Sequence, residues 1–372
     1  MTLPASRVVG TSFYLGIPST TRSSAYDCVS LAADLGIRHF FTSLQMPEAD
    51  IPGSLDEFQA IGKLAEQRHL AIMADVHPIV FQRIGGNLND LRALRQLGIQ
   101  SLRLDAGFSD EEIRQLLNTV DQFQMHVVLN GSPVTDASLE RLQGLGVPLN
   151  GTVASHNYYP RAESGLARSF VAEQALRLHR YGCVVMGFVA SQSNHRYMTS
   201  EGLPTLEGHR YVPPGIAAQE LFSLGWCDQV YLGDQTDDPS ELKALLAATE
   251  DPSLVIRIRL NPEAGAAERA VALDAVHVHL AQDFALVHRA AGWRQKSGAS
   301  GILPQARSLA RRRGAVTVDN ARYLRFAGEL QIARVDLPAD SRVNVVGWVI
   351  DEDLPLLESL GPRVRFRFQS VG

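Results

Sequence analysis

Polar side chains stand at the end of most of the apolar runs in the first 240 residues of this sequence. These residues are Ser43, Asp75, Asp105, Asn130, His156, Asn157 and Asp234. A carboxylate can transfer a proton or act as a nucleophile, and an amide or imidazole can hydrogen-bond a hydroxyl group. The set is therefore typical of a site for a polar, hydroxylated substrate.

The runs that precede these residues predict buried strands. They cover residues 8–14, 37–42, 70–76, 99–105, 125–130, 149–156, 183–189 and 228–234. Amphipathic segments lie between them, and several end at a glycine such as Gly36, which favours a helix terminus. Eight apolar strands that alternate with helices predict a (β/α)8 TIM barrel, in which the carboxyl ends of the strands meet at one rim.

The carboxylates have both chemical and structural interpretations. Asp75, Asp105 and Asp234 are expected at the rim, where a charge is costly unless it is paired or used. Each of them has a structural alternative, such as capping a helix or pairing with Arg103. Glu207 lies in a long polar stretch, residues 190–215, and long irregular loops in compact domains are usually functional.

The pattern changes after about residue 245. Charged and β-branched residues then alternate over residues 255–260, 315–318, 329–335, 343–350 and 364–368. A period of two is typical of strands with one exposed face. The sequence therefore predicts a barrel over residues 1–248 and a small antiparallel β domain over residues 249–372.

The overall composition excludes several classes of protein. The formal net charge of -5 provides no basic surface for nucleic acid, and no segment approaches the length and hydrophobicity of a membrane span. The cysteines Cys28, Cys183 and Cys227 form no CxxC pair, and the N-terminus shows no signal segment. We expect a cytoplasmic protein with no nucleic-acid or membrane partner.

Motifs for metals and nucleotides are absent from the sequence. It contains no phosphate-binding loop, no GxGxxG after a strand, no GxSxG and no HExxH. His277 and His279 share one face of a predicted strand, but no third ligand candidate other than Asp274 and Asp283 lies nearby, so an exposed pair is the better interpretation. The sequence therefore predicts no metal and no organic cofactor.

Several longer strings resemble those of the 6-phospho-N-acetylmuramidase (MupG) family. They are 41–44 (FTSL), 103–108 (RLDAGF), 155–161 (SHNYYPR), 164–166 (SGL), 202–210 (GLPTLEGHR), 318–320 (VDN), Tyr323, 328–331 (GELQ) and 344–347 (NVVG). They occur in the family's order over nearly the whole chain. The resemblance implies a TIM barrel followed by a cyclophilin-like β domain. It also implies an intracellular glycosidase of peptidoglycan recycling that cleaves N-acetylmuramic acid 6-phosphate–N-acetylglucosamine.

Hydrolysis of a glycoside requires one carboxylic acid and a second carboxylate. The candidates for this pair are Asp75, Asp105, Glu207 and Asp234. The candidates for the 6-phosphate are Arg161, His209 and Arg210, because guanidinium groups bind phosphate in a bidentate manner. The candidates for the sugar groups are Ser43, Asn130, His156 and Asn157, with Glu329 as a group that reaches the site from the β domain.

Two other functions are compatible with the same residues. A sugar-phosphate isomerase or lyase would use a barrel of this type but would need a metal or a Schiff-base lysine, and the predicted rim carries no lysine, since Lys63 falls within a helix. A carbohydrate-binding protein would use the carboxylates only as hydroxyl acceptors. It would bind its sugar without turnover.

Overall fold

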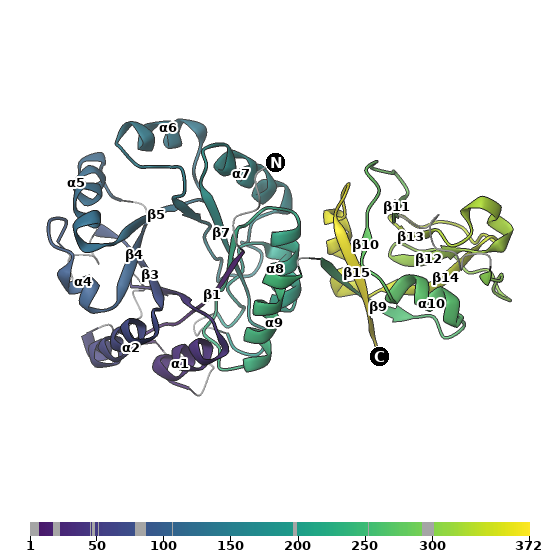
Figure 1. Ribbon diagram of the computed structural model, residues 1–372, viewed down its shortest axis with the longest axis horizontal. Coiled ribbons are helices and arrows are strands. Elements are labelled where there is room, and N and C mark those ends of the chain that lie inside the picture. Colours follow the sequence, from purple (N-terminus) through teal and green to yellow (C-terminus); the bar gives the residue numbers. More distant parts are fainter. Residues whose placement is uncertain are drawn as a thin grey trace. The chain divides into compact units, whose positions relative to one another are not determined.

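The computed structural model describes residues 7–17, 23–44, 46, 49–50, 52–78, 87–105, 107–195, 199–251, 253–291 and 301–372. The chain divides into two compact units, Met1–Glu250 and Asp251–Gly372. Figure 1 shows the helices and strands of both units. No helix within the described residues combines the length and the apolar character that crossing a membrane requires.

The first unit is a closed barrel of eight parallel strands in sequential order, with β1 paired to β8 (Figure 1). The strands are β1 (Val8–Ser12), β2 (His39–Ser43), β3 (Ala71–Val76), β4 (Ile99–Leu104), β5 (His126–Asn130), β6 (Val153–Ser155), β7 (Val184–Val189) and β8 (Gln229–Leu232). Each overlaps one of the predicted runs. The predicted TIM barrel is confirmed.

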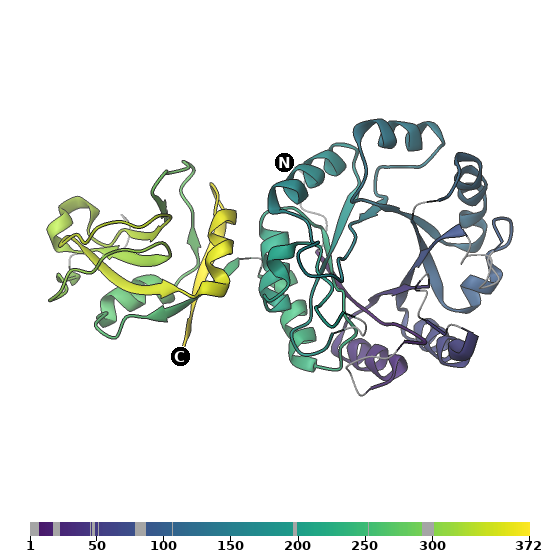
Figure 2. The same cartoon turned by 180° about the vertical axis from the view of Figure 1, so that it is seen from behind.

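Helices surround the barrel, as Figure 2 shows from behind. They are α1 (Ala25–Leu35), α2 (Leu55–Arg68), α4 (Arg92–Gln96), α5 (Asp110–Val120), α6 (Asp136–Gly144), α7 (Arg168–Arg180), α8 (Pro214–Ser223) and α9 (Pro239–Glu250). Short 3-10 segments lie at Pro52–Ser54 (η1), Asp121–Phe123 (η2) and Glu207–His209 (η3). Local chemistry explains where some of the α-helices begin and end. Ser109 precedes α5 and forms a capping box with Glu112, and Gly36 ends α1 at a φ of 107°.

The interior of the barrel is filled by large side chains from alternating strand positions. Phe41, Met73, Val128, Phe188 and Tyr231 belong to one buried cluster, in which the Phe41 and Phe188 rings meet edge to face at 5.1 Å. Successive side chains on a strand point to opposite faces. The residue two positions after each interior residue therefore points inward at the carboxyl rim, which places the polar strand ends described below.

The second unit contains a curled sheet with the order β10-β15-β9-β14-β12-β13-β11 within the described residues. The strands are β9 (Leu254–Leu260), β10 (His277–Val278), β11 (Val287–Arg289), β12 (Ala315–Asp319), β13 (Leu330–Ala333), β14 (Val343–Val349) and β15 (Arg365–Val371). Helix α10 (Ala266–Leu273) and the 3-10 segments η6 (Ala321–Phe326) and η7 (Asp351–Ser359) complete the unit.

The pairs of this sheet are antiparallel, as predicted, except that β15 runs parallel to β9. The chain leaves β14 through η7 and returns on the far side of β9 rather than beside β14. The alternation of buried Phe366 and Phe368 with exposed arginines predicts the strand β15 but not its direction. The sheet is therefore mixed rather than wholly antiparallel.

Candidate functional site

An ion pair between β3 and β4 lies at the carboxyl rim of the barrel. Arg103 donates from Nη1 to Asp75 Oδ1 at 2.7 Å, and both side chains are buried. Asp75 follows the interior residue Met73 by two positions, and Arg103 is its register partner on β4. Both side chains therefore point into the barrel mouth. Arg103 also donates from Nη2 to Asn157 Oδ1 at 2.5 Å, which joins the residues after β6 to the same network.

A second carboxylate lies beside this network. Asp105 immediately follows β4, and Asn130 at the end of β5 donates from Nδ2 to Asp105 Oδ1 at 3.0 Å. Asn130 Oδ1 in turn accepts the Ser132 backbone N–H at 3.3 Å, so the amide is oriented by the loop. Both side chains are half-buried and so are in contact with solvent at the mouth.

The register determines the separation of the two carboxylates. Asp75 pairs with Arg103, and Asp105 lies two residues farther along β4, with its N–H donating to Val76 O at 3.2 Å. With about 4.8 Å between strands and about 3.3 Å rise per residue, the two Cα atoms are about 8 Å apart. This Cα spacing is compatible with the separation of about 5 to 9.5 Å at which two carboxyl groups can act together on a glycosidic bond.

Aromatic and hydroxyl side chains adjoin these carboxylates. Tyr158, just after β6, packs edge to face against Phe41 at 5.9 Å and Phe188 at 5.3 Å. Its half-buried ring lies on top of the barrel core. Ser43 is the buried register partner of Asp75 on β2. No role was predicted for Tyr158, and Arg103 was expected only as a structural partner of an aspartate, although both belong to the family-like strings.

His156 faces away from the mouth. Its side chain points to the opposite face from those of its neighbours Ser155 and Asn157, and it is 0% exposed. The distance from His156 Nδ1 to Ser132 Oγ is 3.3 Å. Burial, and then the charge of Arg103, lowers its pKa to about 4, so the imidazole is neutral. Ser132 Oγ accepts the Asn157 backbone N–H at 2.8 Å. The geometry therefore favours a positioning role for His156, through Ser132, over the predicted contact with sugar.

Asp234 also lies outside the group of rim carboxylates. Its position after β8 is of opposite parity to the interior residue Tyr231, and the side chain is fully buried. Oδ2 accepts the backbone N–H groups of Ser191 at 3.0 Å and Leu203 at 3.1 Å. The carboxylate therefore anchors both ends of the loop that follows β7. These contacts favour a structural role for Asp234 over the predicted role as a catalytic acid or base.

Glu207 and Arg210 form a clamp between two loops rather than an open site. Arg210 is 1% exposed and donates to both Glu207 carboxylate oxygens at 2.7 Å. Its remaining N–H groups donate to the carbonyls of Tyr159, Glu201, Gly202 and Arg161. Glu207 also accepts backbone N–H groups from Glu163 and Gly165.

This clamp changes the predicted roles of both residues. The hydrogen bonds from Arg210, followed by the two backbone N–H groups, lower the pKa of Glu207 to about 2. A carboxylate of such low basicity is a poor proton donor near neutral pH. All five guanidinium donors of Arg210 are used within the protein, so it has none for a phosphate. The geometry therefore argues against both predictions.

His209 is likewise part of the scaffold. It is fully buried and hydrogen-bonds through Nε2 to Glu220 Oε2 at 2.7 Å, while Arg168 donates to Glu220 Oε1 at 2.8 Å. Of the three residues predicted to bind phosphate, Arg161 has an exposed side chain.

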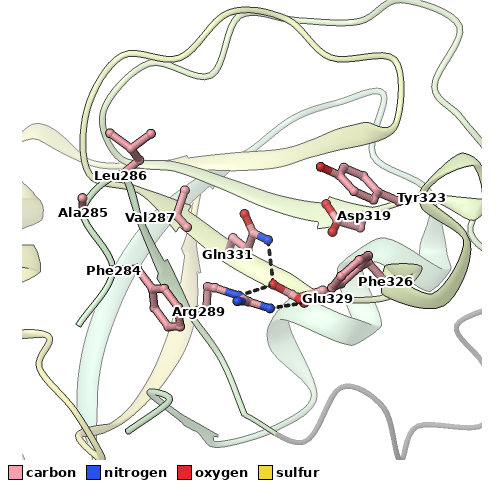
Figure 3. A pocket seen from close by; sticks show the side chains of 10 residues that line it. All are labelled: Phe284, Ala285, Leu286, Val287, Arg289, Asp319, Tyr323, Phe326, Glu329 and Gln331. Carbon is pink, nitrogen blue, oxygen red and sulfur yellow. Dashed lines mark hydrogen bonds and ion pairs between the residues drawn. The ribbon is translucent and has the colours of Figure 1, made fainter. Parts of the chain in front are cut away.

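Glu329 belongs to the second unit, where it lines a cavity of about 410 Å³ (Figure 3). It is buried, and Arg289 donates to its two carboxylate oxygens at 2.5 and 2.8 Å. Gln331 donates to Glu329 Oε1 at 2.7 Å. The predicted action of Glu329 on the barrel chemistry stays a prediction, and its visible partners are those of its own unit.

His277 and His279, the two histidines of the predicted strand, contact a backbone carbonyl and another histidine. His277 Nε2 contacts Ala272 O at 2.9 Å, and His279 Nε2 lies 3.2 Å from His288 Nδ1. No group of three or more histidine, cysteine, aspartate or glutamate side chains suited to a metal ion occurs in the described part of the chain. Both imidazoles are buried, whereas an exposed pair was predicted.

Asp319 lines the same cavity as Glu329 and makes the stability of the protein depend on pH. Burial and then repulsion by Glu329 raise its pKa from 3.8 to about 7. The folded protein thus holds this proton where the unfolded chain loses it, so the free energy of unfolding falls as the pH rises from about 4 to 7. We expect Asp319→Asn to raise the free energy of unfolding above pH 7, by at most about 4 kcal/mol, and to change it little at pH 4. Urea denaturation at both pH values measures this, and an equal effect at both would contradict it.

Comparisons with known proteins bear on both units. The family model described as 6-phospho-N-acetylmuramidase, N-terminal, matches residues 9–247, and the C-terminal model of the same family matches residues 254–369. An uncharacterised Bacillus cereus protein is similar in structure, with a TM-score of 0.80 and 26% identity over 98% of this chain and 99% of that chain.

A conserved Enterococcus faecalis protein of unknown function is also similar in structure. Its TM-score is 0.72 and its identity is 27% over 98% of this chain and 97% of that chain. No curated protein matches the sequence.

Proposed function

Since this chain belongs to the 6-phospho-N-acetylmuramidase family, a family of glycosidases, we propose that it hydrolyses the bond between N-acetylmuramic acid 6-phosphate and N-acetylglucosamine. We further propose that it acts in the cytoplasm during peptidoglycan recycling. The observation that carries the proposal is the pair Asp75 and Asp105, two carboxylates on neighbouring strands at the mouth of one barrel.

The surroundings of the two carboxylates favour different roles. Asp75 is ion-paired with Arg103, which stabilises it as a carboxylate. Asp105 is hydrogen-bonded to the neutral amide of Asn130 and is more exposed. We assign Asp105 as the acid that protonates the leaving glycosidic oxygen. Asp75 then acts on the anomeric carbon, either directly or through a water molecule.

Neighbouring side chains supply the sugar contacts in this proposal. Asn130 is held at both amide atoms and Asn157 at its Oδ1, and each amide keeps hydrogen-bonding capacity for hydroxyl or acetamido groups. The half-buried Tyr158 ring offers an apolar face for a pyranose. Ser43 lies next to Asp75 in the register.

Arg161 is the candidate for the 6-phosphate, because its side chain is exposed in the family-like loop after β6. A hydrogen-bonded charge pair contributes about 1.5 to 3 kcal/mol. We therefore expect Arg161→Ala to raise KM for the phosphorylated disaccharide about tenfold or more and to change KM for the unphosphorylated one little. Steady-state kinetics on both substrates measures this.

The control is Arg180→Ala, at the carboxyl end of α7, where Arg180 pairs with Asp136 at the surface. It should leave both KM values unchanged. If Arg161→Ala affects both disaccharides equally, the side chain orders the loop instead of binding phosphate.

A further inference from the structure

The cavity in the second unit has the features of a ligand site of its own. Figure 3 shows side chains from four places converging on it. Arg289 lies on β11 with residues 284–287 at and before its start, Asp319 lies at the end of β12, Glu329 and Gln331 lie beside and on β13, and Tyr323 and Phe326 lie on η6. Its volume of about 410 Å³ is within the range of about 300 to 1,000 Å³ that is common for small-molecule sites. It is large enough for one pyranose ring.

Asp319 provides the first evidence for an absent ligand. Its side chain is 2% exposed, and within the described residues its Oδ1 has no hydrogen-bond donor. A buried acceptor without a donor costs about 1 to 3 kcal/mol. Its backbone is fixed by two hydrogen bonds, from Asp319 N–H to Glu329 O at 3.0 Å and from Gly328 N–H to Asp319 O at 2.7 Å, so the carboxyl group is held in place. A ligand that donates a hydrogen bond would satisfy it.

The charges around the cavity argue against an anionic ligand. The Arg289 guanidinium is already neutralised by a bidentate contact with Glu329. Arg342 is similarly paired with Asp340. An anion would therefore meet the Asp319 and Glu329 carboxyl groups, and among the described residues that line the cavity the only cation is the already paired Arg289.

The aromatic rings argue against a cationic ligand. Guanidinium groups lie over three rings near the cavity: Arg289 over Phe284 at 4.8 Å, Arg342 over Tyr323 at 4.4 Å and Arg325 over Phe326 at 5.0 Å. Each of these rings already makes a cation–π contact with a guanidinium group of the protein, so the rings favour an uncharged ligand over a further cation. An uncharged ring with hydroxyl donors can instead contact the apolar edges of Phe284, Tyr323 and Phe326 while it donates to Asp319.

We propose that this cavity is a binding site for an uncharged sugar ring, held by a hydroxyl-to-Asp319 hydrogen bond and by contact with Tyr323 and Phe326. The proposal concerns binding only. It does not depend on the chemistry assigned to the barrel, because every residue that it uses belongs to the second unit.

Methyl resonances can test the proposal, because Leu286 and Val287 line the cavity. The full chain, labelled at leucine and valine methyl groups, is titrated with N-acetylglucosamine while NMR spectra are recorded. We expect saturable shifts at Leu286 and Val287. Glucosamine, which is cationic at neutral pH, and N-acetylglucosamine 6-phosphate should bind at these reporters at least severalfold more weakly.

Variants separate this site from the barrel. Asp319→Leu and Tyr323→Ala should each weaken binding at these reporters tenfold or more, and the half-buried Tyr323 is replaceable without loss of a core side chain. Arg322→Ala, an exposed neighbour on η6 that does not line the cavity, should bind as the wild type does. Asp105→Asn should also retain these shifts, which distinguishes this site from failure of the proposed hydrolysis.

Three results would overturn the proposal. They are an absence of shifts at Leu286 and Val287 at saturating N-acetylglucosamine, unchanged binding in Tyr323→Ala, and preferential binding of either charged sugar.

Discussion

Replacing Asp105 with asparagine is expected to lower kcat for the phosphorylated disaccharide by about 10²- to 10⁴-fold, the usual contribution of a positioned acid. Asparagine keeps an oxygen that can accept the Asn130 amide, so the local structure should persist. The thermal midpoint should therefore change little. Initial rates and a thermal melt of the same preparation measure both quantities.

Asp75→Asn should cause a comparable loss of activity together with a loss of stability. The substitution leaves the buried Arg103 guanidinium without its counter-charge, and removal of one partner of a buried pair costs about 3 to 5 kcal/mol. Asp121→Asn, at an exposed position after α5, is the control and should alter neither kcat nor the thermal midpoint.

Retention of more than a third of wild-type kcat by Asp105→Asn would remove Asp105 from the mechanism.

The second large effect is expected on stability, from Glu207→Gln. The substitution replaces a carboxylate that accepts from Arg210 and two backbone N–H groups with an amide that is partly a donor. Because the Glu207 side chain is 34% exposed, the loss should be smaller than for a fully buried pair. We expect about 2 kcal/mol, or about 4 to 8 °C in the thermal midpoint.

The pH dependence of that loss is a second test of the clamp. The folded-state pKa of Glu207 is lowered to about 2 from 4.5, so its stabilising contribution is full above about pH 4.5 and disappears as the pH falls towards 2. The difference between wild type and Glu207→Gln should shrink over the same window. Glu173→Gln, at an exposed position of α7, is the matched control. Equal stability of wild type and Glu207→Gln at pH 7 would show that the clamp contributes nothing.

The barrel could be predicted from the sequence because its signal is local. Strands such as residues 183–189 are continuous apolar runs, and several helices end at a recognisable terminus such as Gly36. The direction of β15 could not be predicted, because alternation in a single strand is the same for parallel and antiparallel pairing.

The site was predicted in part, for a related reason. Asp75, Asp105, Asn130 and Asn157 were expected together because parallel strands bring their carboxyl ends to one rim, and the structure brings them together. His156 and Asp234 fall one residue out of phase with the interior positions, and a shift of one residue turns a side chain to the other face.

The roles of Glu207 and Arg210 depended on partners distant in the sequence. The carbonyl of Tyr159 and the N–H of Gly165 occupy their polar atoms, and no local pattern reveals such contacts. The exposed Arg161 and the buried Arg210 are both arginines in family-like strings. Their environments, and not their residue type, separate the phosphate candidate from the clamp.

The most direct test of the proposed hydrolysis is to incubate the purified protein with N-acetylmuramic acid 6-phosphate–N-acetylglucosamine and to identify the products by mass spectrometry. The structure and the family together predict two monosaccharides, of which only the muramic acid carries phosphate, and much slower cleavage of the unphosphorylated disaccharide. A phosphorylated disaccharide that is bound but stays intact, or that is converted to an isomer of unchanged mass, would contradict the proposed glycosidase activity.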